Sequence, residues 1–142
     1  MPFQPLHELL PQLAEAETRA ITLPSADNEF KLPAGTYLFV ETFCNEKGCD
    51  CRKVMFSVFH NMEKMSLAVI SYGWESEAFY KKWMRVNDKE LARQMMKPSL
   101  NELSPQSIYA GKILNMFNCV LLPGTKYLAR VKTHYGLFRS KL

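Results

Sequence analysis

The stretch that decides the fold runs from Gly35 to His60 and reads GTYLFVETFCNEKGCDCRKVMFSVFH. Both of its ends are rich in β-branched and aromatic residues, a composition typical of β-strands. We expect strands over residues 36–43 and 51–60, joined by the short segment CNEKGCD. Because the connection is so short, the two strands are expected to pair as an antiparallel hairpin.

A third strand is expected over residues 65–73, where MSLAVISYG has the same character. After Gly73 the apolar period lengthens from two residues to about three and a half, which indicates helices. We expect helices over residues 5–20, 74–84, 87–97, 104–122 and 126–142. The predicted fold class is α+β: a small antiparallel three-stranded meander packed against about four helices, with an N-terminal helix.

The chain has 142 residues, the size of one ordinary domain. We expect a single domain over residues 1–142, with an N-terminal helix and loop (1–34), a β-meander (35–73) and a helical part (74–142). No window approaches the roughly 18 apolar residues of a membrane helix, and the N-terminus lacks the regions of a signal peptide. The sequence therefore predicts a cytoplasmic protein without a membrane partner.

Charge is distributed unevenly around a net value of +4. Residues 1–30 hold five acidic side chains and one basic one, whereas residues 124–142 hold five basic side chains and no acidic one. Aromatic residues lie among these C-terminal charges at helical spacing, which indicates core positions rather than a platform for stacking bases. Nucleic-acid binding is therefore not favoured. The opposed charges can attract each other across the fold or meet an unidentified macromolecular partner.

Three of the four cysteines follow the pattern C-x4-C-x-C at Cys44, Cys49 and Cys51. A hairpin places Cys44 close to opposite Cys51, and residues two apart on a strand share a face. Gly48 can adopt the positive φ that a tight turn needs. Three converging thiols predict a metal site, above all for zinc, although such sites also take iron. A redox pair and three incidental thiols are the alternatives.

A tetrahedral site needs a fourth ligand, for which His134, Cys119 and water are the candidates. Cys119 lies among apolar residues, where a lone cysteine is typically part of the core. His134 lies beside the apolar stripe of the last helix, where its ring nitrogens need partners in the core or at a metal. The basic side chains of Lys47, Arg52 and Lys53 are expected to keep the thiols deprotonated.

The chain also resembles a family of uncharacterised bacterial proteins, on the segments CDCRKV (49–54), ISYGWESEAFYKKWM (70–84) and HYGLFRSKL (134–142). That family combines a C-x4-C-x-C-R turn, an SYGWES segment and a C-terminal H-Y-x-L-F helix. The resemblance implies no activity. It does imply one ligand set, made of Cys44, Cys49, Cys51 and His134.

Together these features predict a small zinc-stabilised bacterial domain of unknown biological role, serving as a non-catalytic binding or accessory module. Arg52 is expected beside the site, bonded to Glu41 or Glu75. One alternative is an enzyme with an open zinc position and Glu41, Asp50 or Glu75 as its acid–base group. The other is a thiol redox protein. The sequence contains none of the common catalytic or nucleotide-binding motifs.

Overall fold

The computed structural model describes residues 2–124 and 126–142, which form strands, α-helices and one π-helix. The strands are β1 (Phe3–Pro5), β2 (Arg19–Leu23), β3 (Gly35–Cys44), β4 (Lys53–His60), β5 (Ala68–Gly73) and β6 (Ser99–Leu100). The helices are α1 (Leu6–Leu9), α2 (Pro11–Glu17), α3 (Glu77–Met84), α4 (Lys89–Met96), α5 (Ala110–Met116), the π-helix η1 (Phe117–Leu121) and α6 (Lys126–Arg139).

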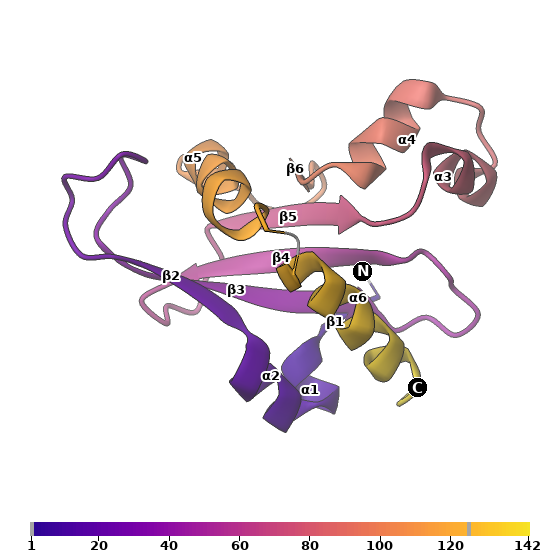
Figure 1. The fold of residues 1–142 in the computed structure, drawn as a ribbon, viewed down its shortest axis with the longest axis horizontal. Coiled ribbons are helices and arrows are strands. Elements are labelled where there is room, and N and C mark those ends of the chain that lie inside the picture. Colours follow the sequence, from indigo (N-terminus) through magenta and orange to yellow (C-terminus); the bar gives the residue numbers. More distant parts are fainter. Residues whose placement is uncertain (1, 125) are drawn as a thin grey trace.

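All six of these strands form one antiparallel sheet with β3, β4 and β5 at its centre (Figure 1). Strand β3 is ten residues long, so a single edge of it pairs with two short strands. Residues 42–44 of that edge pair with β1, and residues 35–39 pair with β2. On the far side of the sheet, β6 pairs with residues 70 and 71 of β5.

The expected three-stranded meander with about four helices is wrong, although the α+β class is right. The meander exists as β3, β4 and β5, but three more strands extend it and the described residues form six α-helices. The added strands are two to five residues long, and β1 includes Pro5. Segments this short carry too little alternation to be recognised, and they are ordered by the long strands beside them.

The helix expected over residues 104–122 starts later, at Ala110, and ends in the π-helix. The segment before Ala110 makes hydrogen bonds to the sheet instead of the internal hydrogen bonds of a helix. The Gln106 side chain binds both the N–H and the carbonyl of Val69, and the Ser107 N–H donates to Leu67. These bonds satisfy the backbone along the edge of β5, so the segment does not coil there.

Two other helix boundaries differ from expectation. The helix expected over residues 5–20 is divided at Leu10 into α1 and α2, and α2 begins at Pro11. Helix α4 is capped by Asp88, whose carboxylate accepts the N–H groups of Glu90 and Leu91. An aspartate at this position satisfies N–H groups that have no partner within the helix.

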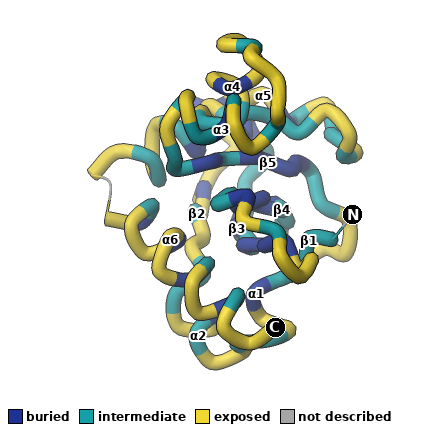
Figure 2. Tube along the Cα trace, turned by 90° about the vertical axis from the view of Figure 1, so that its right-hand side faces the viewer, coloured by how far each residue is buried: buried dark blue, intermediate teal, exposed yellow. Residues whose placement is uncertain are grey.

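The core lies between one face of the sheet and the helices α5, η1 and α6. Tyr37, Phe39 and Phe43 alternate along β3 and are fully buried. The ring of Phe39 lies 5.8 Å from that of Phe117, and the ring of Phe43 lies 5.5 Å from that of Phe138. In Figure 2 the buried positions concentrate in the strands, whereas the outer side of α6 is exposed.

The opposite face of the sheet carries Thr42, Cys44 and Met55, all buried. Helix α4 contacts β5, and the turn between β3 and β4 lies near the start of α3 and the end of α6. This arrangement places the cysteine turn between two helical parts of the chain. Within the described residues, no helix combines the length and the apolar character needed to cross a bilayer.

Candidate metal centre

The turn between β3 and β4 brings the Sγ atoms of Cys44, Cys49 and Cys51 within 4.8 Å of one another. Cys44 is the last residue of β3, and Cys51 lies two residues before β4 begins. Between them Gly48 has a φ of 79°, and the Cys49 N–H donates to the carbonyl of Glu46 over 3.2 Å. The predicted convergence of the three thiols is therefore confirmed.

These three sulfurs fit a single metal ion. Zinc bound through Zn–S bonds of about 2.3 Å holds its sulfurs about 3.8 Å apart. The S···S distances, at most 4.8 Å, need to shorten by no more than about 1 Å. Across residues 2–124 and 126–142, no histidine, carboxylate or fourth cysteine joins the group. The chain thus supplies three donors.

Burial dominates the ionisation of two of the thiols. It raises the pKa of Cys44 above its usual value and that of Cys51 to about 12, with the neighbouring thiols acting in the same direction. The expectation that basic neighbours keep these two thiols deprotonated is wrong, because desolvation of the thiolate outweighs their charge. Without a metal, Cys44 and Cys51 are therefore protonated and weakly nucleophilic at neutral pH.

Arg52 holds the end of the turn in a left-handed backbone conformation, with a φ of 49°. Its N–H donates to the Tyr135 hydroxyl over 3.3 Å, and its carbonyl accepts the Tyr80 hydroxyl over 2.8 Å. Its guanidinium bonds to Asp50 over 2.8 Å and lies 3.5 Å from Glu75. The expected contact with Glu75 is present, whereas Glu41 contacts other residues.

The last helix also holds the turn. The Arg139 guanidinium donates to the carbonyl of Cys44 over 2.8 Å and to that of Glu46 over 3.0 Å. The ring of Tyr135 lies edge-on to that of Trp74 at 5.0 Å. Residues from three distant segments, 49–54, 70–84 and 134–142, therefore meet around this turn.

Gly73 marks a close approach beside the same turn. A Cβ there would overlap the hydroxyl of Tyr80 and lie 2.6 Å from the backbone carbonyl of Met95. Only glycine leaves room for the Tyr80 hydroxyl that binds Arg52. The role of Gly73 in the SYGWES segment is therefore steric. Sequence reasoning missed the contacts of Tyr80 and Arg139 with the turn, because no local sequence pattern marks these two residues.

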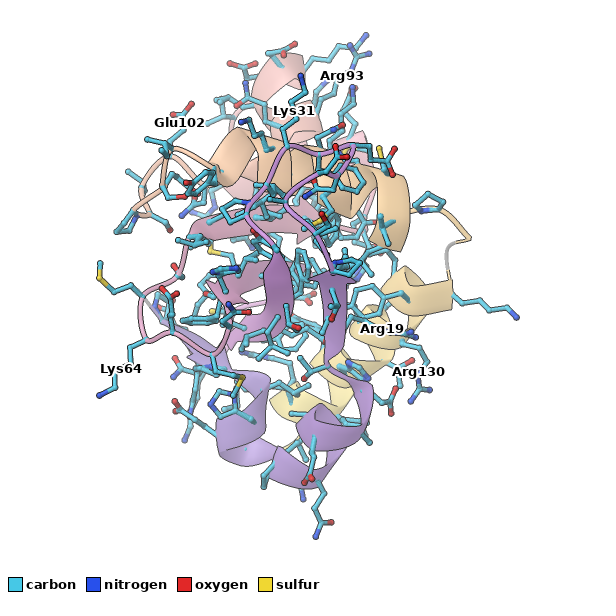
Figure 3. The ribbon with its side chains drawn as sticks, turned by 90° about the vertical axis from the view of Figure 1, so that its left-hand side faces the viewer. Arg19, Lys31, Lys64, Arg93, Glu102 and Arg130 are labelled. Carbon is cyan, nitrogen blue, oxygen red and sulfur yellow. The ribbon has the colours of Figure 1, made fainter. Side chains whose placement is uncertain are left out.

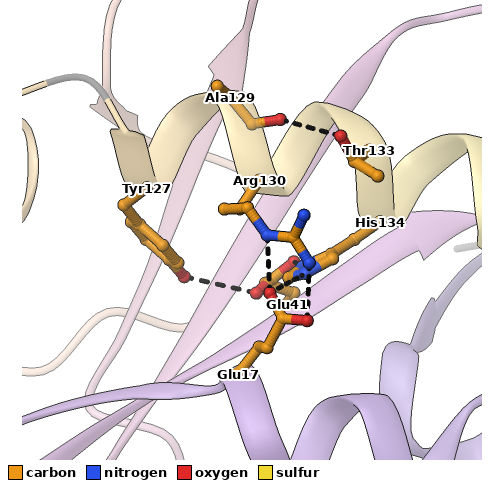
Figure 4. Close-up of polar contacts among 7 residues, drawn as sticks. All are labelled: Glu17, Glu41, Tyr127, Ala129, Arg130, Thr133 and His134. Carbon is orange, nitrogen blue, oxygen red and sulfur yellow. Dashed lines mark hydrogen bonds and ion pairs between the residues drawn. The ribbon is translucent and has the colours of Figure 1, made fainter.

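His134 lies in α6, fully buried beside Glu17 and Glu41 (Figure 4). The structure does not bring it to the three cysteines. Its Nδ1 is 2.7 Å from Glu41 and its Nε2 is 3.0 Å from Glu17. Tyr127 donates to the other oxygen of Glu41 over 3.3 Å, and Arg130 binds Glu17 through two bonds of 2.7 Å. Both ring nitrogens of His134 are thus engaged by carboxylates.

These five residues form a charged network that joins α2, β3 and α6. Hydrogen bonds from Arg130 and then His134 lower the pKa of Glu17 to about 2. Burial opposes a charged imidazole, but the bonds to Glu41 and Glu17 outweigh it and raise the pKa of His134. Figure 3 labels Arg130 and the nearby Arg19. The guanidinium of Arg19 lies 5.2 Å from the centre of the Tyr127 ring. The network stabilises a charged histidine and leaves it no free nitrogen.

The other candidate donors and acid–base groups are also placed elsewhere. Cys119 is exposed and its Sγ lies 3.7 Å from the Asn115 side-chain oxygen, so its expected place in the core is wrong. Glu41 is buried against His134, and Asp50 bonds to Arg52. Each candidate therefore has a partner outside the group of three sulfurs.

A cavity of about 280 Å³ adjoins the centre and is lined by all three cysteines. A second cavity, of about 400 Å³, lies beside it, and Lys53, Asn101 and Leu103 line both. Lys53 is half-buried, and burial lowers its pKa. Sequence reasoning missed this cavity because its walls come from segments far apart in the chain, including Phe3 and Trp83.

No known family model, curated protein or solved structure matches the chain.

Proposed function

We propose that the chain is a zinc-binding domain in which Cys44, Cys49 and Cys51 hold one metal ion. The observation that carries the proposal is the mutual approach of the three Sγ atoms within 4.8 Å. Thiolate donors favour zinc and other soft ions over magnesium or calcium. Zinc also tolerates small departures from ideal geometry, because its filled d shell imposes no preferred arrangement.

The metal has a structural role in this proposal. The segment from Asn45 to Gly48 is exposed and contributes no buried apolar side chain, so packing alone stabilises it weakly. A metal ion joins the end of β3 to the residues before β4 and fixes this segment. Because the fold holds the three donors together, metal binding favours the folded chain and adds to its stability.

The surroundings favour a binding or accessory module over a metal-dependent hydrolase. Hydrolysis needs a carboxylate or histidine free to move a proton beside the metal. Among the candidates, Glu41 is buried against His134 and Tyr127. Asp50 bonds to Arg52, and Glu75 lies 3.5 Å from the same guanidinium. Burial raises the pKa values of Cys44 and Cys51, so without a metal these two thiols are poor nucleophiles for a redox role.

Thermal unfolding in the presence and absence of zinc tests this proposal. A ligand that binds only the folded state raises the unfolding temperature by an amount that grows with the logarithm of its concentration relative to its dissociation constant. We expect zinc to raise this temperature and a chelator to lower it, in the wild type and in the matched variant Cys119→Ser. In Cys51→Ser, zinc should have little effect. If neither zinc nor the chelator changes the unfolding temperature of the wild type, the proposal is contradicted.

A further inference from the structure

The cavity beside the cysteines determines what occupies the remaining coordination position of the metal, an inference that rests on the proposed function. All three cysteines line the cavity, and no fourth protein donor of the described chain joins their sulfurs. A zinc ion with three protein ligands takes its fourth ligand from solvent or from a bound molecule. The open position is therefore next to a space large enough for such a molecule.

Lys53 supplies positive charge in that space. It is the first residue of β4, two residues after Cys51, and it lines both cavities. In the described parts of the chain its ammonium makes no hydrogen bond or ion pair, although Glu46 and Glu102 line the same two cavities. A half-buried ammonium without a partner favours an anionic ligand.

The remaining walls of the cavity that the three cysteines line are largely apolar. Phe3, Met55, Trp83 and Leu103 line it, together with the polar residues Asn101 and Glu46. Trp83 is 41% exposed and Leu103 is 85% exposed, so both carry apolar surface that the fold leaves uncovered. Concave sites with mostly apolar walls and a few polar groups typically bind small organic molecules.

We propose that this cavity binds a small carboxylate with an apolar body, which bonds to the metal through one oxygen and to Lys53 through the other. Three thiolates and one Zn²⁺ carry a net charge of −1, and Lys53 and Glu46 on the cavity wall add one charge of each sign. Lys53 is therefore the positive side chain that this cavity offers to an added anion. The apolar walls take up the aliphatic or aromatic body and remove it from water.

Cobalt-loaded protein tests the proposal, because the visible absorption of Co²⁺ reports changes in its ligands. Benzoate serves as the probe and benzamide as its neutral counterpart. We expect benzoate to change the cobalt spectrum with a saturable dependence on concentration, and benzamide to leave it unchanged. Lys53→Met should weaken benzoate binding at least tenfold and keep the cobalt content. Lys47→Met is the matched control, because Lys47 is exposed and does not line the cavity.

Several outcomes would overturn the proposal. Cobalt binding without any spectral response to benzoate would remove the ligand site and leave the metal centre intact. Loss of cobalt in Lys53→Met would assign Lys53 to the metal centre itself. A changed cobalt spectrum in Glu46→Gln before any ligand is added would show that Glu46 fills the fourth position. Failure of the wild type to bind cobalt would instead contradict the proposed function.

Discussion

Arg139 donates a hydrogen bond of 2.8 Å to the carbonyl oxygen of Cys44, which joins the last turn of α6 to the first of the three cysteines. The two residues are 95 positions apart in the sequence. A charged donor at a backbone carbonyl stabilises the conformation that positions the cysteine side chain. The C-terminal helix therefore supports the candidate metal centre from outside, without supplying a ligand to it.

Replacing this arginine tests that support. Arg139→Ala removes the bonds to the carbonyls of Cys44 and Glu46. Substitution of a residue that positions a metal ligand typically lowers the metal affinity tenfold or more. We therefore expect Arg139→Ala to lose about tenfold in zinc affinity. The free energy of unfolding should fall by about 1–2 kcal/mol. Competition with a chromophoric chelator and urea unfolding measure the two effects.

Lys132→Ala provides the matched control for this variant. Lys132 lies on the same helix, is exposed, and should affect neither zinc affinity nor stability measurably. Equal zinc affinity in Arg139→Ala and Lys132→Ala would show that α6 does not support the centre.

Two glycine substitutions should have opposite effects. Gly73→Ala forces the new methyl group against Tyr80 and the carbonyl of Met95, so we expect a loss of about 1–3 kcal/mol in the free energy of unfolding. Gly136 lies within α6, and an added Cβ there would meet no neighbouring atom within 4 Å. Gly136→Ala should therefore stabilise the fold by about 0.5–1 kcal/mol. Urea unfolding of both variants measures the difference, and a stabilising Gly73→Ala would contradict the observed packing.

The network around His134 predicts a specific dependence of stability on pH. Glu17, with its pKa lowered to about 2, stabilises the fold fully above its unfolded pKa of about 4.5, and this contribution is lost as the pH falls toward 2. His134, whose pKa is raised, stabilises the fold fully below its unfolded pKa of about 6.5. Its contribution is lost as the pH rises through the folded value. The network therefore stabilises the fold most between about pH 4.5 and pH 6.5.

His134→Gln isolates the histidine. The free energy of unfolding of the wild type minus that of the variant should be largest between about pH 4.5 and 6.5 and should shrink as the pH rises through the folded pKa of His134. Taking this difference cancels contributions that both proteins share, including that of the metal centre. A difference that grows above pH 6.5 would show that His134 is buried neutral and is not paired with Glu41 and Glu17.

Local features of the sequence were enough to predict the hairpin and its thiols. The alternation along residues 36–43 and 51–60 and the short loop between them determine the pairing, and C-x4-C-x-C on such a hairpin brings the sulfurs together. The edge strands were missed because their pairing depends on the length of β3 rather than on their own pattern. The coil before α5 was missed because the bonds of Gln106 to Val69 replace helical bonds.

The surroundings of His134 could not be predicted for a different reason. Its partners, Glu41 and Glu17, are 93 and 117 residues away in sequence. A histidine beside an apolar stripe needs buried partners, and the sequence pattern does not distinguish two carboxylates from a metal ion. The same holds for Tyr80 and Lys53, whose roles depend on which segments pack beside the cysteine turn.

The zinc content of the purified protein, measured together with the number of thiols open to alkylation, tests the central claim most directly. The account predicts one zinc ion per chain, with Cys119 alkylated and Cys44, Cys49 and Cys51 protected. Zinc should be retained in His134→Gln and lost in Cys51→Ser. A zinc-free wild type with four reactive thiols would contradict the account, and loss of zinc from a folded His134→Gln variant would show that His134 is a ligand.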